Sequence, residues 1–138
     1  MTDSTTASAR KIPAPAVNLE SKPFWDAAAE GRFLIKRCTA CGKAHWYPRA
    51  ICPYCFSGET VWEASPGEGV IYTYSVMYRS PTGPYAIGYV TLDEGPAVLT
   101  NFVDCDLGAF AIGQRVKVRF QPTEGGPPVP VFAPVRAA

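Results

Sequence analysis

Two Cys-x-x-Cys pairs constrain the fold of this chain more than any other feature. The first pair is Cys38 and Cys41, the second is Cys52 and Cys55, and ten residues separate the pairs. A tight turn that carries two thiolates can chelate a metal ion, and two such turns supply the four sulfurs of a closed tetrahedral site. The spacing therefore predicts a structural metal on these four cysteines, and zinc is the expected ion.

Three other uses of these cysteines are possible. Iron in a rubredoxin-like site takes the same four sulfur ligands, so the sequence leaves iron open beside zinc. A redox dithiol usually has one Cys-x-x-Cys pair at a helix N-terminus near a βαβ pattern, which this sequence does not show. Disulfides need an oxidising compartment. Residues 1–11 lack the apolar core of a secretory signal, and no segment has the 18 or so apolar residues of a membrane span. We therefore expect a cytoplasmic chain with reduced thiols.

The other chemically active side chains do not make a catalytic centre in the sequence. His45, the single histidine, lies between the two cysteine pairs and is expected to be a polar residue of the ribbon loop, because four cysteines already close the site. Cys105 is flanked by two aspartates, whose charges disfavour a thiolate. The adjacent carboxylates Asp93 and Glu94 are expected to point apart on a turn. A metal with four sulfur ligands has no open position for Lewis-acid chemistry. We therefore expect no catalytic residue and no catalysis by this chain alone.

Composition and turn residues predict a mainly β fold that begins with one helix. The 138 residues include 14 prolines and 12 glycines, which favour short strands and turns over long helices. One helix is expected at residues 20–31. Ser21 is a good N-cap, Pro23 suits the first turn and Gly31 suits the C′ position. Residues 1–19 have the composition of a disordered tail.

Two modules are expected after the helix. Residues 32–64 are predicted to form a rubredoxin-like zinc ribbon with strands at 32–37, 44–49 and 60–63. Residues 65–138 are predicted to form a barrel followed by a C-terminal tail. Five strands are expected there, at residues 70–77, 86–92, 97–103, 115–120 and 129–135. Side chains alternate in the first and fourth segments, the second and third have the pattern of a hairpin, and the last follows a Gly-Pro loop. Five strands with a long first strand are typical of a small barrel of the OB-fold type.

These motifs, in this order, resemble the zinc-ribbon and OB-fold family known as domain of unknown function thirty-five. The resemblance covers about residues 20–135. The matching segments are Phe24-Trp25, Glu30–Leu34, Arg37–Gly42, Tyr47–Arg49, Cys52–Cys55, Gly69–Ser75, Pro84-Tyr85, Leu92–Pro96, Leu99–Asn101 and Ile112–Val116. Phe56 departs from the glycine that is common in the family after the second cysteine pair, but all four metal ligands are kept.

The resemblance implies a small non-catalytic accessory subunit of a thiolase-like complex. Such a complex acts on an acyl-CoA or ketoacyl-CoA as a thiolase, an aldolase or an acyltransferase, making or breaking a C–C bond in the first two cases. The larger, thiolase-fold subunit carries the nucleophilic cysteine, and the small subunit shapes the acyl or CoA channel or bridges subunits. A two-plus-two heterotetramer is expected.

Two sets of residues are predicted to serve this role. We call residues 38–55, which carry the two cysteine pairs, the finger. Basic residues in or next to the finger are expected to face the phosphates of CoA, and Arg is better suited than Lys to bidentate contact with phosphate. These are Lys36, Arg37, Lys43 and Arg49. Large aromatic residues are common anchors of protein interfaces. Those expected to contact the partner are Phe24, Trp25, Trp46 and Tyr47. The sequence also allows the alternative that these rings pin the helix to the ribbon.

The main alternative function is nucleic-acid binding, since both ribbons and OB-fold barrels serve it. Seven tyrosines are available to stack on bases, and Arg115, Lys117 and Arg119 make one cationic strand face. Against this, 13 basic and 12 acidic residues leave a net charge of only +1, so no overall field attracts a polyanion. An independent CoA-binding chaperone or scaffold is a third possibility.

Overall fold

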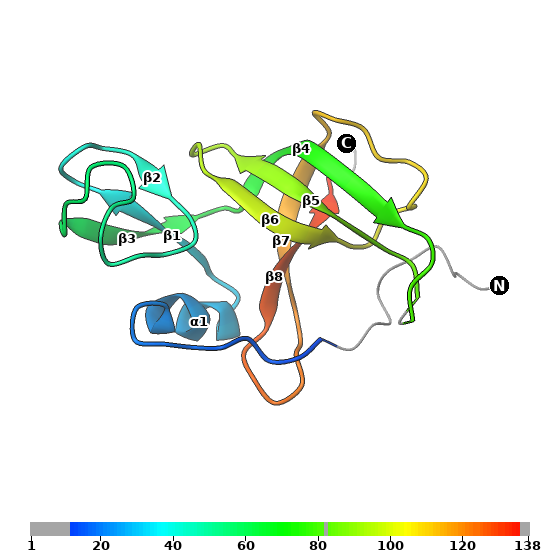
Figure 1. The fold of residues 1–138 in the computed structure, drawn as a ribbon, viewed down its shortest axis with the longest axis horizontal. Helices are drawn as coiled ribbons and strands as arrows, with labels where there is room; N and C mark the ends of the chain where they lie inside the picture. The colour runs from blue at the N-terminus through cyan, green and yellow to red at the C-terminus, as the bar shows by residue number, and fades with distance from the viewer. Residues whose placement is uncertain (1–11, 82, 136–138) are drawn as a thin grey trace.

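The chain forms one helix and eight strands. The structure, a computed structural model, describes residues 12–81 and 83–135. Figure 1 shows the elements in chain order. They are α1 (Lys22–Ala29), β1 (Phe33–Cys38), β2 (Ala44–His45), β3 (Thr60–Ser65), β4 (Glu68–Met77), β5 (Tyr85–Leu92), β6 (Ala97–Phe102), β7 (Arg115–Gln121) and β8 (Val129–Pro134). The predicted mainly β fold is confirmed.

The first three strands form the predicted ribbon sheet, in the order β2-β1-β3 with antiparallel neighbours. The strand predicted at residues 44–49 is only two residues long. Pro48 has no N–H to donate to a ladder. The rings of Trp46 and Tyr47 instead pack against Phe24 of the helix, with ring centroids 5.7 and 6.2 Å away. The second strand is therefore short because the chain leaves the sheet to build the core.

The remaining five strands close into a barrel in the order β4-β5-β6-β8-β7, as predicted. All neighbours are antiparallel except β6 and β8, which pair in parallel at Phe102 and Phe132. Along β5 and β6 buried and exposed side chains alternate, so that Val90 and Val98 fill the interior. The segment between β6 and β7 contains turns and no helix.

Helix α1 begins after Ser21 and ends at Ala29, within the predicted range. The Ser21 hydroxyl lies 3.0 Å from Asn18 Oδ1 and makes no side-chain cap, so its predicted capping bond is absent. The end is as predicted. Gly31 has φ +79°, its N–H donates to the carbonyl of Ala28, and the next N–H donates to Ala27, both at 2.9 Å. These two bonds form a Schellman motif.

One hydrophobic core joins helix, ribbon and barrel. Phe24 is fully buried and meets the ring of Phe33 at 5.9 Å, and Phe33 in turn meets Phe132 of the barrel at 6.2 Å. The indole N–H of Trp25 donates to the Tyr47 hydroxyl at 3.0 Å. Figure 1 shows the helix beneath the ribbon, beside the barrel. The ribbon is thus held by shared packing as well as by its cysteines.

The ends of the chain lie only partly within the described residues. Of the predicted N-terminal tail, residues 12–19 are described, and the Glu124 N–H in the β7–β8 loop donates to the carbonyl of Ile12 at 2.9 Å. Residues 1–11 and 136–138 are outside the described part. No helix among the described residues is long and apolar enough to cross a membrane.

Candidate metal centre and its surroundings

The two turns of the ribbon bring the four predicted cysteines together. Their sulfur atoms all lie within 4.8 Å of one another. Cys38 Sγ is 3.6 Å from Cys55 Sγ, and Cys41 Sγ is 3.7 Å from Cys52 Sγ. Bonds of about 2.3 Å from zinc to sulfur place the sulfurs of a tetrahedral site about 3.8 Å apart. The arrangement therefore fits a tetrahedral four-thiolate metal site.

Backbone amides point at the sulfurs of Cys38 and Cys52 and favour the ionised form of these two thiols. The N–H of Cys41 donates to Cys38 Sγ at 3.4 Å, which lowers the pKa of the Cys38 thiol. Burial opposes ionisation of Cys52, but the N–H groups of Cys55 and Tyr54 outweigh it and lower the pKa of Cys52 to about 7. A metal needs thiolates, so these amides prepare the site for binding.

The two turns have the same backbone pattern with a different residue at the last position. In the first turn Gly42 has φ +81° and its N–H donates to the Cys38 carbonyl at 2.8 Å. In the second, Phe56 has φ +64° and its N–H donates to the Cys52 carbonyl at 2.9 Å. The Phe56 ring is 78% exposed, so no core packing compensates for this backbone conformation. The sequence departure at Phe56 is thus tolerated at a conformational cost.

Two of the four residues predicted to contact CoA already have side-chain partners within the ribbon. Lys36 is buried, donates to the Thr60 hydroxyl at 3.1 Å and lies over the Trp62 ring, and burial lowers the pKa of its amine. Arg37 makes a bidentate pair with Glu63 at 2.7 and 3.0 Å. As neighbours on one strand they also point to opposite faces. Lys36 and Arg37 therefore do not form one cationic group.

The other two basic residues remain accessible. Lys43 is exposed, with its amine 5.0 Å from the centroid of the Tyr54 ring. Arg49 is exposed, and within the described part of the chain no ion pair is found for its guanidinium. Its backbone N–H donates to His45 Nε2 at 3.3 Å.

The aromatic residues predicted as partner contacts are divided by burial. Phe24 is fully buried and Trp25 is 7% exposed, so both belong to the core of the free chain. This is the pinning role that the sequence had left open. Trp46 and Tyr47 are only partly buried and keep some accessible surface. A fully buried ring offers no surface to a partner in the free chain, so the partner-contact prediction is carried forward at Trp46 and Tyr47.

Neither His45 nor Cys105 is set up for chemistry. His45 is buried in β2 and is not among the clustered metal-ligating groups, and burial lowers the pKa of its imidazole. His45 thus lies within the strand predicted at residues 44–49 and is buried there, whereas a polar residue of the ribbon loop was expected at this position. Burial, and then the charge of Asp106, raise the pKa of Cys105 to about 11. This agrees with the sequence argument against a nucleophile at Cys105.

Carboxylates neutralise the cationic face of β7. Arg115 donates to both oxygens of Asp93 at 2.8 and 2.9 Å, and Lys117 lies 3.9 Å from Glu68. Arg119 pairs with Asp104. The pairing at Asp93 lowers the pKa of that carboxyl through its hydrogen bonds from Arg115. A face whose cations are already paired is a poor site for phosphates, so the structure gives no support to nucleic-acid binding there.

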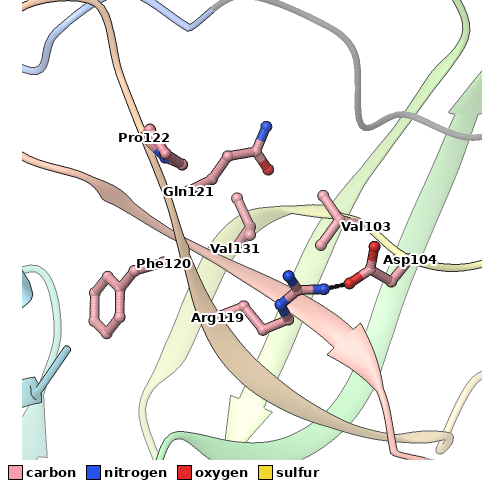
Figure 2. A pocket seen from close by; sticks show the side chains of 7 residues that line it. All are labelled: Val103, Asp104, Arg119, Phe120, Gln121, Pro122 and Val131. Atoms are coloured by element: carbon pink, nitrogen blue, oxygen red, sulfur yellow. Dashed lines mark ion pairs between the residues drawn. The ribbon is translucent and has the colours of Figure 1, made fainter.

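A hollow of about 350 Å³ lies beside the last of these ion pairs. Figure 2 shows Arg119 directed toward Asp104, with Val103 and Val131 beside this pair. The lining residues are Val103, Asp104, Arg119, Phe120, Gln121, Pro122 and Val131. They include no cysteine or histidine, and the one acid is paired. The hollow therefore does not have the groups of an active site.

A four-cysteine ribbon that leads into a closed five-stranded barrel defines the class of zinc-ribbon and OB-fold proteins. The family description "ChsH2, rubredoxin-like zinc ribbon domain" matches residues 25–61, and "ChsH2, C-terminal OB-fold domain" matches residues 62–121. A relative from Methanothermobacter thermautotrophicus, named "DUF35 domain-containing scaffold protein", is 35% identical over 92 residues, covering 62% of this chain and 68% of the relative. The chain belongs to the DUF35 family.

Two solved structures and one more relative also resemble this chain. A chain of the solved structure "Ltp2-ChsH2(DUF35) aldolase" is 31% identical with a TM-score of 0.77, over 87% of this chain and 98% of that chain. A Thermomonospora curvata relative named "Probable enoyl-CoA hydratase alpha subunit" is 31% identical over 126 residues. This chain spans only 40% of that relative's length. A DUF35 protein from Sulfolobus solfataricus, at 16% identity and TM-score 0.60, shares the fold.

Proposed function

We propose that this protein is a non-catalytic, zinc-binding accessory subunit of a thiolase-fold enzyme that acts on an acyl-CoA or ketoacyl-CoA. The observation that carries the proposal is the likeness to a chain of an aldolase complex over 98% of that chain's length. The names of the relatives, a scaffold protein and a hydratase subunit, support a role within an acyl-CoA-processing assembly. The enzyme partner in this assembly makes or breaks a C–C bond or transfers an acyl group.

The chemistry of the described residues supports the non-catalytic part of this proposal. Thiolase-type reactions need an activated thiolate and a positioned acid or base. Here four cysteines form the metal cluster, and the pKa of Cys105 is raised to about 11. The imidazole of His45 is buried. The partner enzyme therefore has to supply the nucleophile and the general bases.

We further propose that the metal is zinc and that its role is structural. Zinc favours a closed tetrahedral set of sulfur ligands, and this geometry is what the sulfur separations fit. In this proposal the zinc ion is held by Cys38, Cys41, Cys52 and Cys55, and it stabilises the ribbon. A cytoplasmic location follows, because thiolates remain available as metal ligands in a reducing compartment.

We assign the contact with CoA to the two predicted basic residues that are exposed. Lys43 and Arg49 are both exposed on the finger. We place them at the rim of a shared channel, where they face the phosphates of a bound CoA ester. The accessible parts of Trp46 and Tyr47 lie on the same finger and are assigned to the partner contact there.

Co-expression tests this function. Each thiolase-fold subunit encoded in the source genome is produced with the tagged full chain, and the purified material is weighed by native mass spectrometry. We expect one of them to form a stable two-plus-two complex that turns over a CoA ester. If none of them binds the chain, while the chain itself is folded and metal-loaded, the proposal is wrong.

A further inference from the structure

The outer face of β5 and β6, together with that of β4 from Thr73 to Met77, carries no charge. Before the bulge, Glu68 at the start of β4 lies opposite Lys117 and belongs to the charged neighbouring region. The strand pairing shows which side chains share this face, because residues directly opposite each other point to the same side of a sheet. Tyr89 lies opposite both Thr73 and Leu99. Ile87 lies opposite both Ser75 and Asn101. The full set is Thr73, Ser75, Met77, Tyr85, Ile87, Tyr89, Thr91, Ala97, Leu99 and Asn101. We call this set the uncharged face. The outer face of β7, in contrast, holds three cations.

The uncharged face exposes large apolar side chains. Leu99 is 55% exposed, Met77 45%, Tyr89 44% and Ile87 38%. Tyr72, the extra residue at the β4 bulge, and Tyr78 just after β4 are each 64% exposed. Taking about 200 Å² for a large side chain, the four members of the face expose roughly 360 Å², and Tyr72 and Tyr78 beside it bring the total to roughly 600 Å². The largest exposed apolar patch of a monomeric protein is about 300–600 Å², and such a patch is often functional.

The same region ends in an open strand edge. On the side away from β5, β4 pairs with β7 only at Glu68–Val70. The stretch from Tyr72 to Met77 therefore has no strand partner on that side among the described residues. It contains neither a charge nor a proline, the features with which proteins usually protect an edge. Such an edge is prone to association unless another surface covers it.

The shape and chemistry of this region select the kind of partner. Because the face lies on the outside of a closed barrel it is convex, and two copies of a convex surface meet over little area. A nucleic acid or an anionic ligand needs cations, which the face lacks. The cavities described by their lining residues involve none of its members. A flat or concave apolar surface on a larger protein fits best.

We propose that the uncharged face, together with the open edge of β4, is the surface by which this chain docks on its enzyme partner. The proposal rests on the proposed function and adds the location and the chemistry of the contact. The partner presents an uncharged apolar surface, and the area of about 600 Å² approaches the roughly 800 Å² per partner of a standard interface. The finger contact at Trp46 and Tyr47 lies outside this face.

Single charged substitutions on the face test the docking claim. We compare Leu99→Lys and Tyr89→Lys with Val61→Lys, a matched control because Val61 is a strand residue of the ribbon with 47% exposure. Zinc content and circular dichroism establish that each variant is folded. Binding to the thiolase-fold subunit found by co-expression is then measured by isothermal titration. We expect the two face variants to bind at least tenfold more weakly, Val61→Lys and Leu99→Met to bind normally, and the chain alone to sediment as a monomer.

The remaining outcomes each overturn the claim. If folded Leu99→Lys and Tyr89→Lys bind like the unaltered chain, docking lies elsewhere, while the accessory function stands because the complex forms. If Val61→Lys loses binding as strongly, the effect is not specific to the face. If the chain dimerises and Leu99→Lys abolishes only that, a second copy covers the face. If the unaltered chain binds no thiolase-fold subunit, the proposed function fails and the docking claim falls with it.

Discussion

At the scale of single residues, Gly42 and Phe56 show how the ribbon tolerates sequence change. Both close a cysteine turn with a positive φ and donate the same backbone hydrogen bond. Glycine adopts this conformation without steric cost, whereas a residue with a Cβ does not. The second turn therefore forms because its cysteines and hydrogen bonds impose it, and not because the local sequence prefers it.

We predict opposite effects at these two equivalent positions. Phe56→Gly should raise the free energy of unfolding of the zinc-loaded protein by about 0.5–1 kcal/mol, because it removes the strain at φ +64°. Gly42→Ala should lower it by about 1 kcal/mol. Denaturant titration measures both. Phe56→Ala is the control, since it removes the exposed ring but keeps the strain. A stabilisation by Phe56→Ala equal to that by Phe56→Gly would disprove the strain argument.

Arg49 carries the prediction about CoA. Its guanidinium is exposed and unpaired within the described residues, so reversing its charge should not disturb the fold. Arg49→Glu should raise the KM of the complex for the CoA ester severalfold and leave complex formation intact. Arg32→Glu is the comparison, because Arg32 is an exposed arginine outside the finger. An unchanged KM in Arg49→Glu would remove the phosphate role.

At the scale of elements, the sequence predicted what depends on local spacing. The cysteine pairs specified the ribbon turns. Period-two alternation, a hairpin pattern and turn residues placed the five barrel strands within a few residues. What it missed depends on contacts between distant segments. The sequence had left open whether the Phe24 ring is buried, which only the packing of α1 on the ribbon decides. The pairing of Arg115 with Asp93 joins β7 to the turn after β5, 22 residues away in the chain.

Two further features of the structure have a signal in the sequence, namely the opposite directions of Lys36 and Arg37 and the exposed apolar face of the barrel. Lys36 and Arg37 are consecutive strand residues, so alternation alone places them on opposite faces. The uncharged positions Ile87, Tyr89 and Leu99 alternate with buried ones, so the exposed apolar face of the barrel also has a sequence signal. Pattern analysis identifies such positions, but their exposure becomes known only when the barrel closes.

Helix α1 supplies the prediction at this scale. Phe24 is fully buried and contacts Trp25, Phe33, Trp46 and Tyr47. Phe24→Ala should therefore destabilise the protein by about 3–5 kcal/mol, the range for removing a buried aromatic ring. Val61→Ala, at an exposed strand position, should change stability by less than about 0.5 kcal/mol. A near-neutral Phe24→Ala that abolished partner binding would restore the interface role for this ring.

At the scale of the whole molecule, one core couples the metal site to the barrel. Phe33 lies on β1, five residues before Cys38, and packs on Phe120 and Phe132 of the barrel strands. Loss of the ribbon would therefore expose barrel residues as well. The four thiolates and the shared aromatic cluster act on the same folding unit, so metal binding should stabilise the entire chain.

Metal removal tests this coupling. Freshly purified protein should contain one equivalent of zinc, and binding at such a site contributes on the order of 10 kcal/mol to folding. Cys38→Ser, or treatment with a strong chelator, should unfold the ribbon and lower the melting temperature of the barrel. Cys105→Ser is the control, because Cys105 lies outside the cluster. Folded protein with well under one equivalent of zinc or iron would contradict the metal assignment.

The most direct test of the accessory role is a turnover measurement on three samples. These are the zinc-loaded chain alone, its thiolase-fold partner alone, and the complex, each with the same CoA ester. We predict no turnover by the chain alone and the highest kcat/KM in the complex, because the partner holds the nucleophile and this chain completes the channel. Turnover by the chain alone, after every trace of the partner is removed, would contradict the account.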